Sequence, residues 1–240
     1  MAMQKLFSLI ILITLSYTGY VSASSRVVLS GIKDAVNSDI SLIVLKQAYG
    51  KLGIDVEYVP LPGERALQTA NSGEVDGEVF RITNVQRKYN NLIPVPTPIN
   101  ILEGVAFSKR SDLKVSDWHS LRHLKIGIQV GIKFAERGTR GMKPVMVDTN
   151  EQLFKMLDAG RVDVAIVALT NGLKTLSLLK LKSIHAISPS IQQYPLYHYI
   201  HNKNVSLVPR LNAVLIDMKN SGEIKHIRDT FLQKMMDATR

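Results

Sequence analysis

One short motif occurs twice in this chain, each time between a helix-like segment and a strand-like segment. Residues 71–76 read Asn-Ser-Gly-Glu-Val-Asp, and residues 158–163 read Asp-Ala-Gly-Arg-Val-Asp. In each copy the glycine can take the left-handed conformation that ends a helix, the valine can close the helix end onto a core, and the aspartate can begin a turn. A unit repeated at the same place in both halves predicts two lobes of one architecture.

The segments around both copies alternate between short apolar strands and amphipathic helices. Helices are expected at about 39–52, 64–72, after Gly131 and at 151–159, and strands at 26–29, 54–59, 75–80, 125–128, 144–147 and 164–168. Such alternation predicts an α/β fold with a helix-flanked sheet in each lobe. Because ligands of open α/β sheets bind outside the carboxyl ends of the strands, we expect a site where the strands after the two motifs end.

Two longer strand-like stretches, 99–108 and 193–200, each lead from one half of the chain to the other. They are expected to form a paired hinge. The last two helices, at about 205–221 and 223–236, would then return to the first lobe. The predicted domains are residues 24–107 with 201–240 for lobe 1 and residues 108–200 for lobe 2.

The first residues have the parts of an export signal. Lys5 precedes an apolar run at 6–15, and Ala23, with Val21 two residues before it, fits a cleavage site. The run is shorter than the ~20 residues that a bilayer span needs. We therefore expect residues 1–23 to be a signal peptide, cleaved near Ala23, and the mature protein to be periplasmic.

The overall composition narrows the possible partners. The chain has no cysteine, so an exported form would depend on its core instead of disulfides, and no lipid can be attached to a cysteine at the processing site. We expect a freely diffusing monomer. The formal net charge is +10 at pH 7, but the basic residues are spread and no nucleic-acid motif occurs, so nucleic acid is not an expected partner. The basic excess favours anionic ligands or surfaces.

Four stretches together resemble a known family. They are Leu67–Thr83, Leu121–Gly131, Glu151–Val167 and Val208–Phe231. In order and spacing they resemble bacterial extracellular solute-binding proteins of family 3, the polar amino-acid type, which have the type II periplasmic binding protein fold. The resemblance implies a cleft between two lobes, hinge closure on a small solute, and delivery of that solute to an inner-membrane ABC permease. We expect no cofactor and no metal.

The resemblance also implies an arginine in lobe 1 that grips a carboxylate of the ligand. Arg87 lies nearest to the family's arginine position, Arg81 directly follows the strand and is the preferred candidate, and Arg65 at a helix start is the third. A guanidinium suits this role because it donates two parallel hydrogen bonds to a carboxylate and keeps its charge when desolvated. The alternative for each is a surface arginine in an ion pair.

In lobe 2 the segment Gly127–Gly131 leads from a strand into a helix. The backbone N–H groups of Ile132 and Lys133 would lie at the helix N-terminus, where an anion can bind. A simple helix cap is the alternative. The family commonly has threonine or serine where this chain has Ile132, so a hydroxyl contact is lost here.

Ala168 marks a second departure from the family. Members that bind amino acids often carry an aspartate at this strand end, which holds the ammonium group of the ligand. Glu78, Asp34 or Glu103 would have to supply that negative charge in this chain. Without it, an anionic or uncharged polar solute is favoured over a standard α-amino acid.

Three tyrosines in the second hinge stretch, Tyr194, Tyr197 and Tyr199, could stack on a ligand. Alternation of strand residues between core and solvent explains them equally well. The sequence leaves both interpretations open.

Other functions remain as alternatives to transport. A membrane sensor could read the closed form in place of a permease, because both mechanisms use the same population shift. An enzyme on this fold would use Glu78 or Asp34 as a general acid, but the chain has no nucleophile-elbow motif, no cysteine and no phosphate-cradling glycine loop. His119 and His123 have helical spacing, yet no third metal ligand accompanies them. We therefore expect a binding protein without catalysis.

Overall fold

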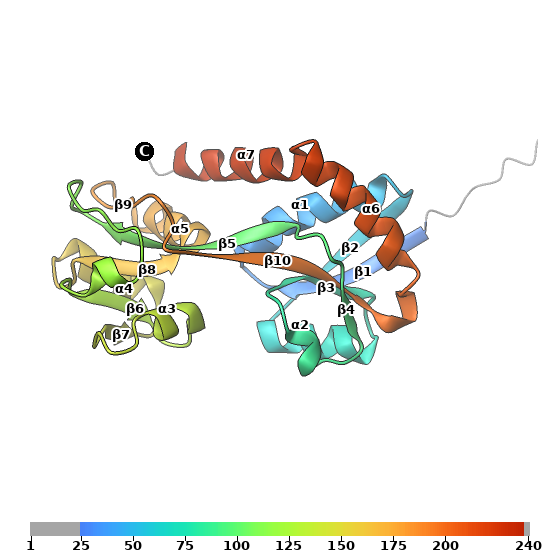
Figure 1. Cartoon of the computed structure of the whole chain (residues 1–240), viewed down its shortest axis with the longest axis horizontal. Coiled ribbons are helices and arrows are strands. Elements are labelled where there is room, and N and C mark those ends of the chain that lie inside the picture. The colour runs from blue at the N-terminus through green and yellow to red at the C-terminus, as the bar shows by residue number, and fades with distance from the viewer. Residues whose placement is uncertain (1–24, 238–240) are drawn as a thin grey trace, which may run out of the picture.

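The computed structural model describes residues 25–237, so the predicted signal peptide and its cleavage site lie outside the described residues. The chain forms two lobes joined by two long strands, and the lobes lie side by side along the longest axis (Figure 1). The α/β fold class predicted from the sequence is confirmed. Among residues 25–237, no helix combines the length and the apolar composition that a bilayer span requires.

Lobe 1 contains the beginning of the described chain, and the chain returns to it after lobe 2. Its sheet has β1 parallel to β2 and β3, and the end of β10 runs antiparallel to β3 and β4. The elements before the first crossing are β1 (Ser25–Ile32), α1 (Val36–Gly50), β2 (Ile54–Leu61), α2 (Gly63–Ser72), β3 (Gly77–Arg81), η1 (Val85–Arg87), β4 (Leu92–Pro94) and β5 (Asn100–Ser108). Those from the second crossing onward are β10 (Gln192–His201), η3 (Asn202–Asn204), α6 (Leu207–Asn220) and α7 (Glu223–Asp237).

Lobe 2 is made from the chain between the two crossings. Its β6 is parallel to β7 and β8, while β5 runs antiparallel to β8 and β9. The elements are η2 (His119–Leu121), β6 (Ile126–Gln129), α3 (Lys133–Gly138), β7 (Val145–Val147), α4 (Asn150–Asp158), β8 (Val164–Ala168), α5 (Leu169–Leu179) and β9 (His185–Ala186).

The hinge consists of β5 and β10, which pair antiparallel from Asn100–Leu196 to Gly104–Gln192. The main path of the sheet runs β2-β1-β3-β10-β5-β8-β6-β7 through both lobes. Each crossing lies within a strand: residues 104–107 of β5 already pair with β8 in lobe 2, and residues 197–200 of β10 pair with β3 in lobe 1. The predicted domain boundaries, after residues 107 and 200, fall one residue before the carboxyl ends of β5 and β10.

The two sequence motifs form the same structure in both lobes. Gly73 and Gly160 have positive φ values of 82° and 68°, which glycine adopts without a Cβ clash. The carboxylate of Asp76 accepts a hydrogen bond from the N–H of Val28 at 2.8 Å, and that of Asp163 accepts one from the N–H of Lys125 at 2.7 Å. Each aspartate thus ties the start of its strand to the neighbouring strand.

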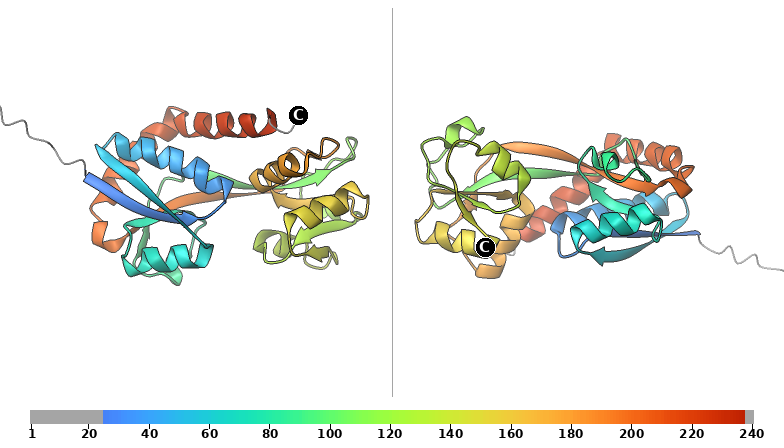
Figure 2. Two further views of the ribbon diagram at one scale, coloured as in Figure 1. Left: turned by 180° about the vertical axis from the view of Figure 1, so that it is seen from behind. Right: turned by 90° about the horizontal axis from the view of Figure 1, so that it is seen from below.

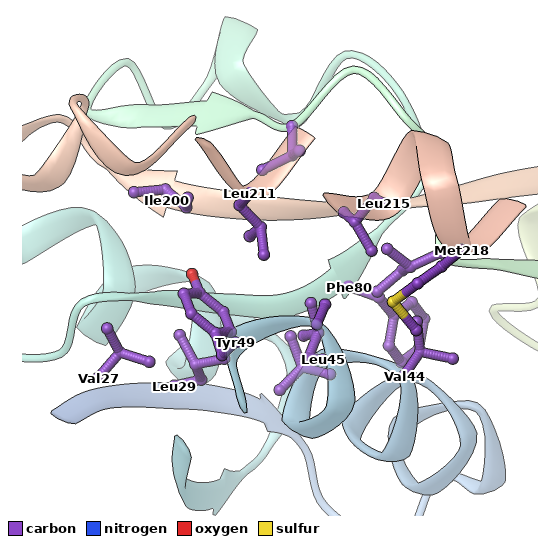
Figure 3. Packing of buried hydrophobic residues seen from close by; sticks show 14 of the residues in the cluster. Val27, Leu29, Val44, Leu45, Tyr49, Phe80, Ile200, Leu211, Leu215 and Met218 are labelled. Atoms are coloured by element: carbon purple, nitrogen blue, oxygen red, sulfur yellow. The ribbon is translucent and has the colours of Figure 1, made fainter. Parts of the chain in front are cut away.

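Each lobe has its own apolar core. In lobe 1, α1 and α6 cover one face of the sheet, and Figure 3 shows their side chains meeting those of β1, β3 and β10. Lobe 2 has one cluster on each face of its sheet, built around Phe154 from α4 and around Phe134 from α3. The helices therefore hold each lobe as a unit, and within residues 25–237 the elements that pass between the two are the hinge strands and α7.

Candidate functional site

A cavity of about 230 Å³, which we call the hinge cavity, lies beside the two hinge strands. Lobe 2 supplies most of its wall, the hinge strands supply two residues, and lobe 1 supplies one. The lining residues are Ile82 from lobe 1, Leu102 and Tyr194 from the hinge, and Gln129, Gly131, Ile132, Phe134, Arg137, Val167, Ala168 and Asn171 from lobe 2.

A second cavity of about 420 Å³, the polar cavity, adjoins the first. The two share Gln129 at the end of β6 and Asn171 in the first turn of α5. The remaining lining residues are Lys33, Asp34 and Ala35 from the β1–α1 loop and Thr149, Asn150, Glu151, Lys174, Thr175 and Leu178 from lobe 2. The hinge cavity lies at the carboxyl ends of β3, β6 and β8, and the polar cavity lies at those of β1 and β6, where a ligand site was expected.

The wall of the hinge cavity is largely apolar, and the ring of Phe134 is part of it. A Cβ on Gly104 of β5 would lie 2.5 Å from Cε2 of Phe134, so only glycine at this position lets the ring lie against the hinge. The ring also faces Tyr194, with centroids 6.1 Å apart, and Trp118 at 6.4 Å. No acidic side chain is among the described residues that line this cavity. Such a wall suits the apolar part of a small molecule.

Arg81, the preferred arginine candidate, is engaged inside lobe 1. Its Nη2 lies 2.7 Å from Oε1 of Glu78 and donates to the carbonyl of Gly63 at 2.7 Å. Ser30 donates to the other carboxylate oxygen of Glu78 at 2.7 Å. Burial raises the pKa of Glu78 to about 7, although the charge of Arg81 and the Ser30 hydrogen bond act in the opposite direction. Arg81 and Glu78 line neither cavity, and the role of Arg81 in carboxylate binding stays a prediction.

The other basic candidates, Arg65 on α2 and Arg87 in η1, are exposed and line neither cavity. Of the acidic candidates, Asp34 lies in the polar cavity, where its carbonyl accepts a hydrogen bond from Nζ of Lys174 at 2.9 Å. Glu103 is paired instead with Arg228 of α7. Asp34 is therefore the acidic candidate that lines one of the two cavities.

Backbone N–H groups after β6, where the sequence predicted an anion site, already donate hydrogen bonds within lobe 2. The N–H of Gly131 donates to Oε1 of Glu136 at 2.7 Å, and the N–H of Ile132 donates to the carbonyl of Gln129 at 3.4 Å. Helix α3 begins at Lys133. An anion bound here would have to displace these hydrogen bonds. Ile132 itself lines the hinge cavity.

Several lining residues have no counterpart in the sequence-based candidates. Phe134 and Arg137 lie on α3, while Asn171 and Lys174 lie on α5. Tyr194 is the one of the three hinge tyrosines that lines the hinge cavity. The β-strand ends could have pointed to Gln129, but α5 itself was not expected, so its side chains could not be placed.

The histidines do not form a metal site in the described part of the chain, where no group of three potential ligands is suitably arranged. His198 is fully buried in lobe 1, between the hydroxyl of Tyr49 at 2.9 Å and the carbonyl of Glu78 at 2.8 Å. Burial lowers the pKa of His198 to about 4. This histidine is therefore a neutral core residue.

Comparisons with known proteins agree with this architecture. No protein-family model matches the chain. An uncharacterized protein of Shewanella oneidensis is 27% identical over 188 residues, which cover 75% of this chain and 71% of that protein. It gives no function, so the remaining information comes from solved structures.

Three solved structures illustrate the likeness. An ancestral cationic amino acid solute-binding protein has a TM-score of 0.67 at 17% identity, covering 87% of this chain and 96% of that one. A histidine kinase sensor domain with similarity to periplasmic binding proteins has a TM-score of 0.62 at 20% identity, covering 86% and 96%. An amino acid ABC transporter substrate-binding protein from Streptococcus pneumoniae, bound to L-arginine, has a TM-score of 0.59 at 17% identity, covering 90% and 96%.

At these identities the likeness establishes the fold. The chain has the two-lobed α/β fold of type II periplasmic binding proteins, as its sequence predicted. Proteins with this fold in the comparison include both substrate-binding proteins and a sensor domain.

Proposed function

We propose that this protein is a periplasmic solute-binding protein that captures a small solute between its lobes. The observation that carries the proposal is the pair of adjoining cavities at the hinge, which share Gln129 and Asn171 and take residues from both lobes. A small molecule bound there would contact both lobes, which is the condition for hinge closure around it.

The contribution of lobe 1 to the hinge cavity supports capture by closure. Ile82 is its one lobe 1 lining residue, so a solute first binds mainly to lobe 2 and to the hinge. Rotation of lobe 1 about β5 and β10 would add further contacts. Because those contacts exist only in the closed form, the solute stabilises closure.

The walls favour a solute with an apolar body and an uncharged or acidic polar group. The hinge cavity has no carboxylate to balance an ammonium group, and an unpaired buried charge is costly. Gln129 and Asn171 can hydrogen-bond a polar group at the passage between the cavities. Arg137 lines the hinge cavity, which has no acidic residue among its described lining residues, so this cavity favours a carboxylate over an ammonium group, whereas Lys174 shares the polar cavity with Asp34 and Glu151.

Two partners for the closed form remain as proposals. Delivery to an inner-membrane ABC permease is the first, since a structural neighbour is an amino acid ABC transporter substrate-binding protein. A membrane signalling protein is the second, since another neighbour is a histidine kinase sensor domain. Permease and ATPase genes beside the gene for this chain would favour transport, and a kinase or cyclase gene would favour signalling.

We propose binding without turnover. Glu78, a candidate general acid, forms its ion pair with Arg81 in lobe 1 and lines neither cavity. The neighbours of the same fold are binding proteins and a sensor domain. Chemical change of a bound solute during incubation with the purified protein would contradict this proposal.

A thermal-shift screen of residues 24–240 tests the function. The panel pairs each α-amino acid with the carboxylic acid that has the same side chain and no amino group, and adds small neutral polar solutes. A solute that binds only the folded form raises the melting temperature, by an amount that grows with concentration. We expect hits among the acids without an ammonium group. Hits confined to amino acids would contradict the proposed solute class, and an absence of any hit would count against solute binding.

A further inference from the structure

The inward face of α7 contacts lobe 1, the hinge and lobe 2 in turn. Ile224 and Ile227 pack against the lobe 1 core. One residue further on, Arg228 forms an ion pair with Glu103 of hinge strand β5, and both side chains are less than one-fifth exposed. Leu232, one turn later, is buried against both lobes. The helix thus follows the direction from lobe 1 to lobe 2.

The far end of α7 completes an apolar cluster that we call the junction cluster. Val36 and Ile40 of α1 represent lobe 1 in it, Leu173 of α5 represents lobe 2, and Leu232 of α7 contacts them. All four side chains are at most 6% exposed. Beside the cluster, Lys174 of α5 donates to the carbonyl of Asp34 in the β1–α1 loop. The two lobes are therefore in direct contact here, in addition to the hinge strands.

The junction cluster and the hinge cavity lie on different sides of the hinge. In Figure 1, α7 runs above β5 and β10, whereas α2 of lobe 1 and α3 of lobe 2 lie below them. Both views in Figure 2 place α7 alongside α5 and α1. Phe134 of α3 lines the hinge cavity, so the cavity faces the α2–α3 side. Rotation that brings α2 towards α3 must move α5 away from α7 or slide it past.

We propose that α7 is a strut that holds the cleft open, and that closure has to break the contact of Leu232 with lobe 2. This inference rests on the hinge closure of the proposed function. A contact that exists only in the open form shifts the population towards that form, and a solute must overcome it to close the cleft. The affinity for solute is then set partly by residues that never touch it.

The test measures the distance between the lobes without any solute. Because the chain has no cysteine, two introduced cysteines carry the only spin labels. Gln68→Cys on α2 and Arg140→Cys after α3 place one label on an exposed position of each lobe. Electron resonance then gives the distribution of distances between the labels. Leu232→Ala removes the contact from the side of α7, and Leu173→Ala removes it from the side of lobe 2.

Ile227→Ala is the matched control, because Ile227 also lies on α7 and packs against the lobe 1 core. We expect Leu232→Ala and Leu173→Ala each to raise the ratio of short to long distances about tenfold, and Ile227→Ala to leave it unchanged. Tenfold corresponds to about 1.4 kcal/mol. Circular dichroism establishes that each variant is folded.

Unchanged or longer distances in both junction variants would overturn the strut. An equal shift in Ile227→Ala would also overturn it, because general loosening of α7 would then be the cause. Since no solute is present, these outcomes are independent of the thermal-shift screen. If no solute raises the melting temperature in the screen, solute binding is rejected. The effect of α7 on the distance between the lobes would still stand as measured.

Discussion

Arg81 and Glu78 form an ion pair within lobe 1, with Nη2 of Arg81 2.7 Å from Oε1 of Glu78. The carboxylate is fully buried and the arginine side chain is 12% exposed. A solute carboxylate could bind Arg81 only in competition with Glu78. The pair therefore has a structural role in the form described, and its removal should first affect stability.

Replacing Arg81 with methionine should destabilise the protein by about 3 kcal/mol, because a buried carboxylate loses its ionic partner. Urea denaturation measures the change in the free energy of unfolding. Arg87→Met is the matched control, since Arg87 is exposed, and it should change that free energy by less than about 0.5 kcal/mol. Equal effects of the two substitutions would show that the ion pair contributes nothing to stability.

Glu78 should make stability depend on pH. Its pKa is about 7 in the folded protein, above its ordinary value of 4.5, so the folded state binds a proton more readily than the unfolded state. The stabilisation from protonated Glu78 is complete below pH 4.5 and is lost as the pH rises through 7. Denaturation at pH 5 and at pH 7.5 measures this loss.

Glu78→Gln is the variant that isolates this effect. Buried His198, with its pKa lowered to about 4, acts in the opposite direction, because the unfolded state gains its proton as the pH falls below 6.5. His198 is present in both proteins, so its contribution cancels when their free energies are compared at one pH. We expect the stability of Glu78→Gln relative to wild type to rise between pH 5 and pH 7.5. A constant difference would contradict the raised pKa.

Gly104→Ala should reduce the hinge cavity. The added Cβ would lie 2.5 Å from Cε2 of Phe134, so the ring has to move towards the solute. We expect a loss of about 1–3 kcal/mol in stability from overpacking and at least about a tenfold loss of affinity for a solute found in the screen. Gly50→Ala is the control, because a Cβ there meets no atom within 4 Å. Unchanged affinity in Gly104→Ala would place the solute away from Phe134.

Asn171 should contact the solute directly, since it lines both cavities. Loss of its amide in Asn171→Ala is expected to weaken binding about tenfold, the effect of roughly one hydrogen bond. Isothermal titration with a solute from the screen measures the affinity. Gln68→Ala on the exposed face of α2 should bind as wild type does. If both variants bind equally well, Asn171 is not part of the site.

The repeated motif made the fold predictable because its chemistry is local. A glycine at the end of a helix and an aspartate before a strand have the same role wherever they occur, and Asp76 and Asp163 each bind the N–H of a neighbouring strand. Because the motif locates the strands that follow it, the strand ends could be predicted as the place of a site. The motif could not show which side chains line the cavities there.

The partner of Arg81 could not be predicted from the sequence. Residues three apart in a regular strand point to opposite faces, so Glu78 and Arg81 should not meet. They do meet because β3 ends at Arg81, where its pairing with β10 is irregular between Tyr197 and Tyr199. Such an irregularity arises from the packing of distant strands and has no signal in the segment itself.

Helix α5 was missed for a different reason. It begins directly after β8, with Ala168 at its N-cap and no side-chain cap hydrogen bond, and it contains Gly172. The helix tolerates this glycine because a Cβ there would lie 2.1 Å from the ring of Phe107. Close packing of Gly172 on β5 thus outweighs the low helix propensity of glycine. Because the helix was not predicted, Asn171 and Lys174 could not be identified as site residues.

The double crossing of the hinge also predicts an order of folding. Lobe 2 comes from one continuous stretch, so its strands can pair as soon as that stretch is available. The sheet of lobe 1 needs β10 beside β3, with Tyr199 opposite Glu78, and a long intervening loop must close first. During synthesis, the N-terminal half therefore waits with β3 unpaired on this edge while lobe 2 folds. The first part of the chain to be made belongs to the last lobe to be completed.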